Sequence, residues 1–311
     1  MNIGKLILKK PYKHFFVSQE QYIAETDELS SSKIKHYYVH PNRKYLELDI
    51  KENYRFDKNG IPVVSFPGIS EDQYNPVTIA QYALAVWELE LPKSKPDFGI
   101  FLKLSNWFIQ NHENGKWQYL YEDKISNLPY GWISGMAQGQ GISVLLRAYS
   151  VDKKKKHLEV CDQAIQYFQK SMADDGVAYK FEAANWWFEE YPNPNNPGHV
   201  FNGHIFALFG IWDHFRITRN ENSKLLFDKG VNGIIDQLEK YDNGWWALYD
   251  QRFKGVLNAS YLDLQIRQLE VLNAIRPEPV LQKYIARWKK YLTDHHKLVK
   301  LTCKRLIQKL F

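Results

Sequence analysis

Cysteine is scarce in this chain of 311 residues, and long apolar runs and blocks of one charge are missing. The two cysteines, Cys161 and Cys303, lie far apart in segments of helical pattern. They support neither a disulfide framework nor a metal knuckle, and we expect both side chains to be buried. No stretch approaches the roughly 18 uncharged apolar residues of a membrane span, and the N-terminus has no apolar signal segment. These absences predict a soluble, cytoplasmic protein with no membrane span.

Charge is only mildly unbalanced. There are 41 basic against 35 acidic residues, a net charge of +6, and the longest run of one sign is the four lysines Lys153 to Lys156. This excess suits an anionic partner. Nucleic acid is not expected, because no helix-turn-helix, zinc-finger or RNA-binding signature occurs, whereas an anionic sugar polymer fits. Aromatic residues make up 15% of the chain, and their rings either hold sugar faces or fill cores.

Familiar catalytic and cofactor motifs are missing as well. Gly139-Gln-Gly141 is no dinucleotide fingerprint, because the third glycine and a βαβ context are lacking, and its small residues instead predict a closely packed helix start. Neither His199 with His204 nor the adjacent His295 and His296 have metal-ligand spacing. No Gly-x-Ser-x-Gly elbow or Cys/His nucleophile pair occurs. We therefore expect neither a cofactor nor a metal.

The organisation of the chain changes near residue 75. Residues 1–74 carry strand and turn signals, in which Lys44-Tyr-Leu-Glu-Leu-Asp-Ile alternates polar with apolar residues and an Asn-Gly turn at Gly60 precedes a second apolar run. These signals predict a small β-rich N-terminal region. Residues 75–311 have helical spacing, and we expect helices at about 75–90, 95–112, 134–151, 153–173, 200–218, 222–240, 259–275 and 279–308.

An internal repeat groups these helices into about four pairs. A similar phrase follows each of the first three pairs, with turns at Gly115, Gly176 and Gly244 before a short aromatic strand. Helix pairs repeated around an axis, with short β-hairpin connectors at one end, predict a mainly α protein with the fold of an incomplete α/α toroid. Functional groups then collect in the connectors over one mouth. A non-catalytic helical solenoid is the alternative.

The connector from Asp174 to Gly198 is the most informative one. It is long, lacks a helix pattern and is too aromatic for disorder, which favours an ordered site loop. Pro192 restricts Tyr191 to an extended backbone, so one carboxylate of Glu189 and Glu190 faces a pocket with the phenol while the other faces water. The alternative is that Tyr191 packs against Trp186 and Trp187 while both glutamates are solvated.

The third hairpin adds a second group of candidates. Tyr249 and Tyr261 lie twelve residues apart across a turn at Gly255, so both can meet at the mouth of the ring. Arg252 has a planar fork that suits a hexuronate carboxylate. Core packing remains the alternative for each tyrosine, and a surface ion pair remains the alternative for Arg252.

Several motifs occur together in an order that is known from one family. They are Gly60-Ile-Pro-Val-Val, Tyr74-Asn-Pro-Val-Thr-Ile-Ala-Gln-Tyr-Ala-Leu, Trp132-Ile-Ser-Gly-Met-Ala-Gln-Gly-Gln-Gly-Ile-Ser, Glu189-Glu-Tyr-Pro, Val200-Phe-Asn-Gly and Tyr249-Asp-x-Arg. Over about residues 60–275 they resemble the D-glucuronyl C5-epimerase family, whose members convert D-glucuronate to L-iduronate within heparosan or heparan sulfate. The family's C-terminal domain is an α/α toroid, in agreement with the helix pairs.

The resemblance implies which residues form the site. Its catalytic residues would be Glu190, Tyr191, Tyr249 and Tyr261, and Arg252 would bind the substrate carboxylate. Five more residues are expected to contact substrate: Asn202, Gln138, Trp132, Trp187 and Trp246. One segment departs from the animal enzymes, because Tyr261-Leu-Asp-Leu-Gln-Ile-Arg-Gln-Leu269 lacks the histidines and threonines found there. A different uronate-containing polymer is therefore open as the substrate.

The expected reaction is C5 epimerisation of glucuronate in a heparosan-like polysaccharide. It needs two acid/base groups on opposite faces of the sugar, with Tyr191 and Glu190 on one face and Tyr249 or Tyr261 on the other. Three alternatives stay open: a uronate polysaccharide lyase, a glycoside hydrolase using a carboxylate pair such as Glu182 and Asp250, and a non-catalytic polysaccharide-binding protein. The oligomeric state is also open, with a homodimer among the options.

Overall fold

The computed structural model describes residues 21–66 and 69–310, and most of this chain is helical. Within that part, ten α-helices occur. They are α2 (Arg43–Asn53), α3 (Pro76–Glu90), α4 (Gly99–Gln110), α5 (Gly135–Asp152), α6 (Lys155–Ala164), α7 (Phe201–Thr218), α8 (Glu221–Gln237), α9 (Ala259–Ile275), α10 (Pro279–Thr293) and α11 (His295–Leu310). Short 3-10 helices follow α6 and α8, at Ile165–Phe168 and Leu238–Tyr241, and another spans Met172–Asp174.

Eight short strands in the described part of the chain form four antiparallel pairs. They are β1 (Tyr22–Ala24) with β2 (Val39–Pro41), β3 (Arg55–Phe56) with β4 (Pro62–Val63), β5 (Gln118–Tyr119) with β6 (Trp132–Ile133), and β7 (Ala178–Lys180) with β8 (Trp186–Phe188). The predicted Asn-Gly turn joins β3 to β4, where Gly60 has a φ of +69° that favours glycine. The third repeated phrase forms only the isolated bridges Asp242–Ala247 and Leu248–Val256.

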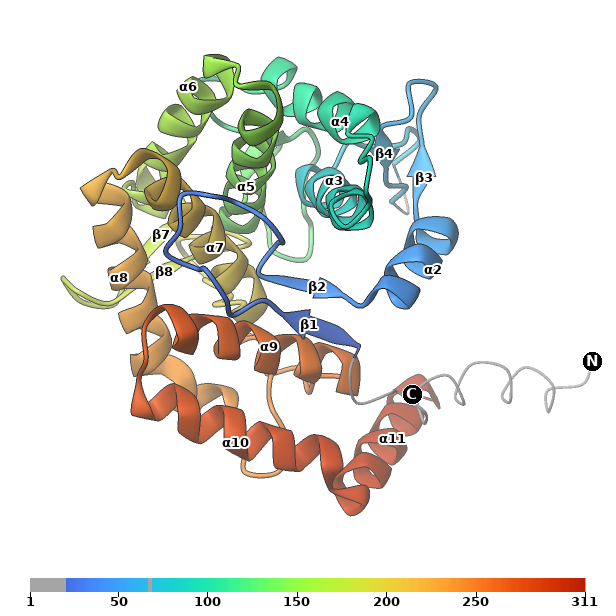
Figure 1. Cartoon of the computed structure of the whole chain (residues 1–311). Helices are drawn as coiled ribbons and strands as arrows, with labels where there is room; N and C mark the ends of the chain where they lie inside the picture. The colour runs from blue at the N-terminus through green and yellow to red at the C-terminus, as the bar shows by residue number, and fades with distance from the viewer. Residues whose placement is uncertain (1–20, 67–68, 311) are drawn as a thin grey trace, which may run out of the picture.

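Four helix pairs form the body of the protein and confirm the predicted incomplete toroid. The pairs are α3 with α4, α5 with α6, α7 with α8, and α9 with α10. The first helices of these pairs contact one another in the order α3, α5, α7, α9, and Figure 1 shows α6, α8 and α10 on the outside. Among the described helices, none is both long and apolar enough to cross a membrane.

Glycine permits the closest helix contact in the ring, between α5 and α7. A Cβ atom on Gly139 would lie 2.5 Å from the Cα of Ala207, and a Cβ atom on Gly210 would clash with the carbonyl of Gly139. The backbones therefore touch where any larger side chain would separate them. This contact accounts for the Gly139-Gln-Gly141 segment by packing, as the sequence predicted.

The N-terminal segment occupies the gap between the two ends of the ring. Strand β1 lies along α9, where the backbone N–H of Tyr22 donates to Asp263 over 3.1 Å, and α2 packs against α3 (Figure 1). Between β1 and β2 the chain crosses the buried ion pair of Arg147 with Asp213, whose side chains are 2.7 Å apart. The Tyr38 hydroxyl donates to Asp213 over 2.6 Å, so this segment is fastened into the core of the toroid.

Three details correct the sequence-based predictions. Residues 43–53 form a helix rather than a strand, because the Asn42 side chain accepts the N–H of Tyr45 and caps its first turn. The predicted helix at 279–308 breaks at Asp294, which has an extended backbone between α10 and α11. Cys161 is buried as expected, but Cys303 is exposed. Residues 1–20 of the predicted N-terminal region lie outside the described residues.

Candidate active site

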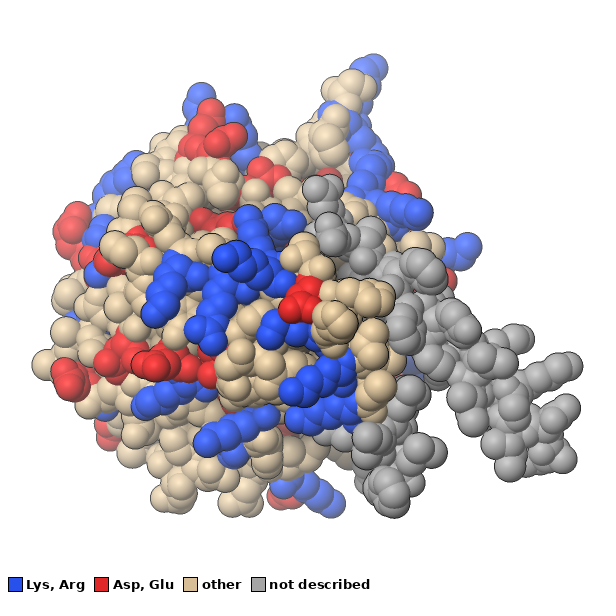
Figure 2. Space-filling view, turned by 90° about the horizontal axis from the view of Figure 1, so that it is seen from below, with Lys and Arg blue, Asp and Glu red and all other residues tan. Residues whose placement is uncertain are grey.

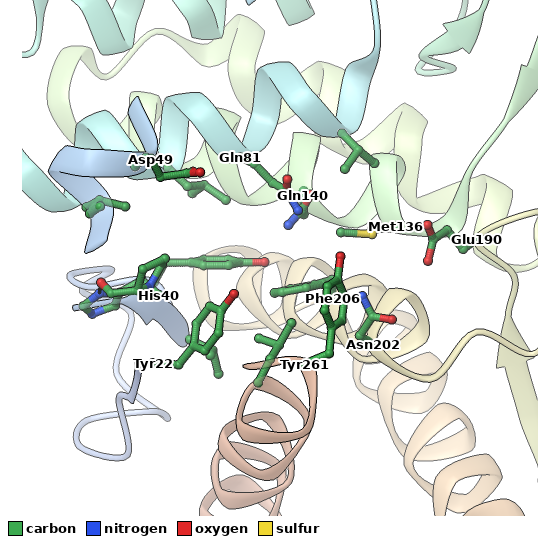
Figure 3. Close-up of a pocket in the computed structure, with 18 of the residues that line it drawn as sticks. Tyr22, His40, Asp49, Gln81, Met136, Gln140, Glu190, Asn202, Phe206 and Tyr261 are labelled. Carbon is green, nitrogen blue, oxygen red and sulfur yellow. Dashed lines mark hydrogen bonds between the residues drawn. The ribbon is translucent and has the colours of Figure 1, made fainter. Parts of the chain in front are cut away.

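A cavity of about 450 Å³ lies where the inner helices begin. Its walls come from the N-terminal segment, from helices α3, α5, α7 and α9, and from two connectors (Figure 3). The polar lining residues are Tyr22, Tyr37, His40, Asp49, Tyr54, Gln81, Gln140, Glu190, Tyr191, Asn202, Tyr249 and Tyr261. The cavity thus collects residues that are up to 242 positions apart in the sequence, from Tyr22 to Leu264.

Glu190 reaches the cavity from the end of the β7–β8 hairpin. The residue follows β8, and its carboxylate packs so closely on α7 that a Cβ atom at Gly203 would clash with it. Its neighbour Glu189 points away and is fully buried, where it accepts from the backbone N–H of His199 over 3.0 Å and pairs with the His199 ring. The expectation that one of these glutamates faces water was wrong, because Glu189 has a buried histidine partner.

Glu190 is a buried carboxyl group without a cationic partner among the described residues. It is 9% exposed, and its Oε2 atom has no hydrogen-bond partner in the protein. Burial raises the pKa of Glu190 to about 7, a hydrogen bond with Tyr191 opposes this, and the negative charges of Glu189 and Asp250 add to it. The group therefore changes its charge near neutral pH, as a catalytic acid or base must.

Three tyrosines surround this carboxyl group, each from a different part of the chain. Tyr191 follows Glu190 directly and its ring lies 5.8 Å from that of Trp132, measured between centroids. Tyr249 is held by two backbone hydrogen bonds, to Gly255 and from Phe201. Tyr261 lies in the first turn of α9, and Figure 3 shows its hydroxyl group pointing into the cavity.

The surroundings keep all three phenols protonated. The charge of Glu190 and burial raise the pKa of Tyr191 far above its usual range. Burial, followed by the charge of Glu190, also raises the pKa values of Tyr249 and Tyr261. A carboxyl group that titrates near pH 7 thus lies among phenols that hold their protons, which is an arrangement suited to proton transfer.

Residues 110–290 match a protein family described as D-glucuronyl C5-epimerase C-terminus. This match covers β5 to β8 and helices α5 to α9, but neither α3 nor the N-terminal segment, which also line the cavity. The chain belongs to this family. It is also 31% identical over 212 residues to the D-glucuronyl C5-epimerase of Caenorhabditis elegans, which corresponds to 60% of this chain and 34% of that relative. The aligned part therefore spans about a third of the relative's length.

Within this member of the epimerase family, five of the ten predicted site residues line one cavity: Glu190, Tyr191, Tyr249, Tyr261 and Asn202. Asn202 lies in the first turn of α7, which has no side-chain cap. The Oδ1 atom of Asn202 has no hydrogen-bond partner in the protein, so its amide group is available to a ligand.

Four predicted substrate contacts are instead packing residues. Gln138 accepts from the Trp117 N–H and donates to the Gly115 carbonyl, so it holds the turn before β5. Trp187 and Trp246 are 0% exposed, with Trp187 stacked on His204 and Trp246 donating to the Leu257 carbonyl. Trp132 is buried and stacks on Tyr119 beneath Tyr191. None of these four residues lines the cavity, so their expected contact with substrate stays a prediction.

Arg252 is not among the residues that line this cavity. Its guanidinium group donates to Ser126 Oγ over 3.1 Å and to the Asn196 carbonyl over 3.5 Å, so it ties two connectors together. The carboxylate pair considered for a hydrolase is also absent from the lining. Glu182 is exposed near the tip of the β7–β8 hairpin, and Asp250 accepts the N–H groups of Phe253 and Lys254 in a turn.

The contribution of the N-terminal segment was missed by the sequence analysis. Tyr22, Tyr37, His40, Asp49 and Tyr54 form one side of the cavity. The only hint was the number of tyrosines before residue 55, which is compatible equally with core packing. No local pattern could place these residues opposite Glu190, because their position depends on how the segment crosses the gap in the ring.

Proposed function

We propose that this protein epimerises a hexuronate at C5 within an anionic polysaccharide, with glucuronate to iduronate as the reaction. The observation that supports it most is the unpaired carboxyl group of Glu190 beside three protonated tyrosines in one cavity. Inversion at C5 requires removal of a proton from the carbon next to a carboxylate and return of a proton to the opposite face. The reaction after which the family is named is of the same type.

The first step in this proposal uses Glu190 as the final proton acceptor. The proton on C5 passes to Glu190, directly or through Tyr191, whose hydroxyl proton moves to Glu190 as its oxygen takes the proton from C5. The electron pair of the C5–H bond enters the sugar carboxylate and forms an enediolate. Deprotonated Glu190 is available at neutral pH because its pKa is about 7.

The second step uses a phenol on the other face of the sugar. Tyr261, or Tyr249 beside it, donates its hydroxyl proton to C5, and the electron pair returns to form the new C5–H bond. The rings of these two tyrosines pack edge to face with their centroids 6.0 Å apart, so both phenols lie on the same side of the cavity. A protonated Glu190 and a phenolate remain, and exchange with water or the reverse reaction restores them.

Charge on the enediolate needs stabilisation, and no lysine or arginine is among the described residues that line the cavity. Four inner helices begin there, at Pro76, Gly135, Phe201 and Ala259, and each helix N-terminus carries a partial positive charge. The amide groups of Gln81, Gln140 and Asn202 add neutral donors. These dipoles and donors are the support that we assign to the negative intermediate.

A basic surface outside the cavity suits a polymer substrate. Helices α10 and α11 contain no acidic residue up to position 304, and Figure 2 shows lysine and arginine gathered on the face over which they run. The exposed lysines there are Lys283, Lys289, Lys290, Lys300 and Lys304. An anionic chain that extends beyond the cavity would be attracted to this face, more strongly at low ionic strength.

The decisive experiment is incubation with heparosan in deuterium oxide, followed by NMR of C5. Deuterium at C5 together with new iduronate supports the proposal. Glu190→Gln, which keeps the shape of the side chain, should reduce exchange by about 10² or more, because it removes the proton acceptor. Glu182→Gln is the matched control, since Glu182 is exposed and lies outside the cavity, and it should exchange like the unmodified protein.

Other products would replace the proposal with one of its alternatives. Unsaturated uronate ends would indicate a lyase, in which the C4 oxygen leaves after the same first step. New reducing ends without unsaturation would indicate a hydrolase. If no exchange occurs on heparosan, the same measurement on other glucuronate polymers separates a wrong substrate from a wrong reaction, and failure on all of them would leave a binding protein.

A further inference from the structure

Two histidines and two glutamates meet at the end of the cavity opposite Glu190. His36 and His40 lie before and in β2, Glu25 follows β1, and Glu88 comes from the last turn of α3. One nitrogen or oxygen atom from each of Glu25, His36 and His40 lies within 4.8 Å of the others. Glu88 Oε2 completes the group, at 2.6 Å from His36 Nδ1 and 3.5 Å from His40 Nε2.

The orientation of His40 leaves one ring nitrogen directed at the carboxylates. Its Nδ1 atom lies 3.0 Å from the Pro41 carbonyl, which can only accept a hydrogen bond, so Nδ1 carries the proton. The Nε2 atom of the neutral ring then presents its lone pair to Glu25 and Glu88, at 3.1 and 3.5 Å. Histidines that bind metals are commonly held in this way, with the second ring nitrogen donating to a carbonyl group.

We propose that Glu25, His36, His40 and Glu88 form a binding site for a divalent transition metal of the zinc type. Ligand atoms of a tetrahedral zinc ion lie about 3.3 Å apart, because each stands about 2.0 Å from the metal. Three of the six distances among the four ligand atoms, 2.6, 3.1 and 3.5 Å, lie around that value. Two imidazole nitrogens with two carboxylate oxygens suit zinc better than calcium or magnesium, which take oxygen ligands.

Charge balance supports the same assignment. A dication offsets the charge of two carboxylates when both imidazoles are neutral, and it would lie between the lone pair of His40 and the buried Glu88 carboxylate. The side chain of Glu88 is only 2% exposed, so its charge needs a partner nearby. Two other cationic groups in this region have partners of their own: Lys35 pairs with Glu28, and Arg147 with Asp213.

The site would fasten the N-terminal segment to the ring. Glu25, His36 and His40 belong to the segment that occupies the gap between α9 and α3, and Glu88 belongs to α3 itself. A metal ion would therefore hold together the wall of the cavity at its His40 end, while the proton-transfer groups remain at the Glu190 end (Figure 3). Its role is structural, and the inference does not depend on the proposed reaction.

The test is metal titration of the full chain after removal of any purification tag and of bound metal with a chelator. Isothermal titration with zinc should give one saturable site per chain, and zinc should raise the melting temperature while calcium should not. Cobalt in place of zinc should give the intense visible absorption of a four-coordinate site. His40→Gln and, separately, Glu25→Gln should weaken zinc binding by about tenfold or more.

His296→Gln is the matched control, because His296 is exposed on α11 and distant from the cluster in the sequence. It should bind zinc with the affinity of the unmodified protein. Absence of saturable zinc binding would overturn the proposal, as would equal affinity in the two cluster variants. If His40→Gln fails to fold, the partly exposed Glu25 still provides the test, because its replacement leaves the buried Glu88 in place.

Discussion

The pKa of a carboxyl group shifts in opposite directions at the two ends of the cavity. At the His40 end, Glu25 and Glu88 lie beside two histidines, and the proximity of His40, with a smaller contribution from His36, lowers the pKa of Glu25. At the Glu190 end the neighbours are tyrosines and further carboxylates, and the pKa of Glu190 rises to about 7. The difference arises from the partners rather than from the carboxyl groups, because burial acts on both ends.

This contrast distinguishes a structural role at one end from a role in proton transfer at the other. A carboxylate with cationic or metal partners stabilises the fold and keeps its charge over the physiological pH range. A carboxyl group surrounded by phenols gains little from its charge and can give or take a proton at low cost. The cavity therefore has one end fitted for fastening the N-terminal segment and another fitted for proton transfer.

The largest expected effect is the loss of exchange when hydroxyl groups are removed at the Glu190 end. Tyr191→Phe and Tyr261→Phe should each lower C5 exchange by about 10² or more, because each removes a proton carrier and little else. Polymer affinity should stay nearly unchanged. The comparison is Tyr22→Phe, whose hydroxyl points into the same cavity from a position between His40 and Tyr261 (Figure 3). Tyr22 has no part in the proposed proton transfer, so this change should leave the exchange rate close to normal.

Loss of polymer affinity or of folding in Tyr191→Phe and Tyr261→Phe would instead favour packing as their role. If only one of these two changes lowers C5 exchange, the exchange rate of Tyr249→Phe decides whether Tyr249 transfers the proton on the second face of the sugar. An equal loss in Tyr22→Phe would remove the distinction between the two ends.

Stability should respond to pH in a way that marks Glu190. Its pKa is about 7 in the folded protein, against 4.5 for the unfolded chain, so the folded state prefers the protonated form. The stabilising effect of that proton is complete below pH 4.5 and is lost as the pH rises through 7. The ionised group then costs about 3 kcal/mol.

Glu190→Gln should remove this cost. The variant and the original protein should have similar free energies of unfolding near pH 4, and the variant should be more stable by about 3 kcal/mol above pH 7. Denaturant titrations at pH 4 to 8 measure the difference. The nearby Tyr191, Tyr249 and Tyr261 stay protonated over this range, and a difference independent of pH would assign the effect to packing.

Glu88→Gln should change the free energy of unfolding in the opposite direction, by lowering it. Glu88 accepts the backbone N–H of Tyr37 over 2.6 Å and pairs with His36 over the same distance. The amide keeps one acceptor but loses the charge that the histidines or a metal ion require, so we expect a loss of about 2 kcal/mol at pH 7. Denaturant titration measures it, and a gain in stability would show that the His40 end is strained by the carboxylate.

Much of the fold was predictable because it depends on local spacing. The helix pairs follow from apolar residues at helical intervals, and the connector that carries Glu190 and Tyr191 stood out by its length and aromatic content. The prediction of a strand at residues 43–53 was wrong. Alternation of polar and apolar residues favoured a strand, whereas the cap at Asn42 and the ion pair of Arg43 with Glu47 stabilise a helix. The repeat could not show that β1 and β2 occupy the gap in the ring.

The site was predicted in part for the same reason. Glu190, Tyr191, Tyr249 and Tyr261 come together because connectors of a toroid meet at one mouth. The tryptophans expected at the site do not line the cavity. An aromatic ring in a connector can point into the core as readily as into a cavity, and the rings of Trp187 and Trp246 point into the core. The histidine cluster was missed because Glu88 and Glu25 join His36 and His40 only through tertiary contacts.

The smallest expected effect concerns Arg252, which belongs to neither end of the cavity. Its contacts with Ser126 and Asn196 hold two connectors, and lysine can keep one of them, so Arg252→Lys should cost less than about 1 kcal/mol of stability and leave most of the exchange rate. Melting temperature, polymer affinity and exchange rate measure the three consequences. A large loss of exchange with normal melting temperature and polymer affinity would instead support Arg252 as the residue that binds the substrate carboxylate. The lost contact would then stabilise the enediolate more than the bound ground state.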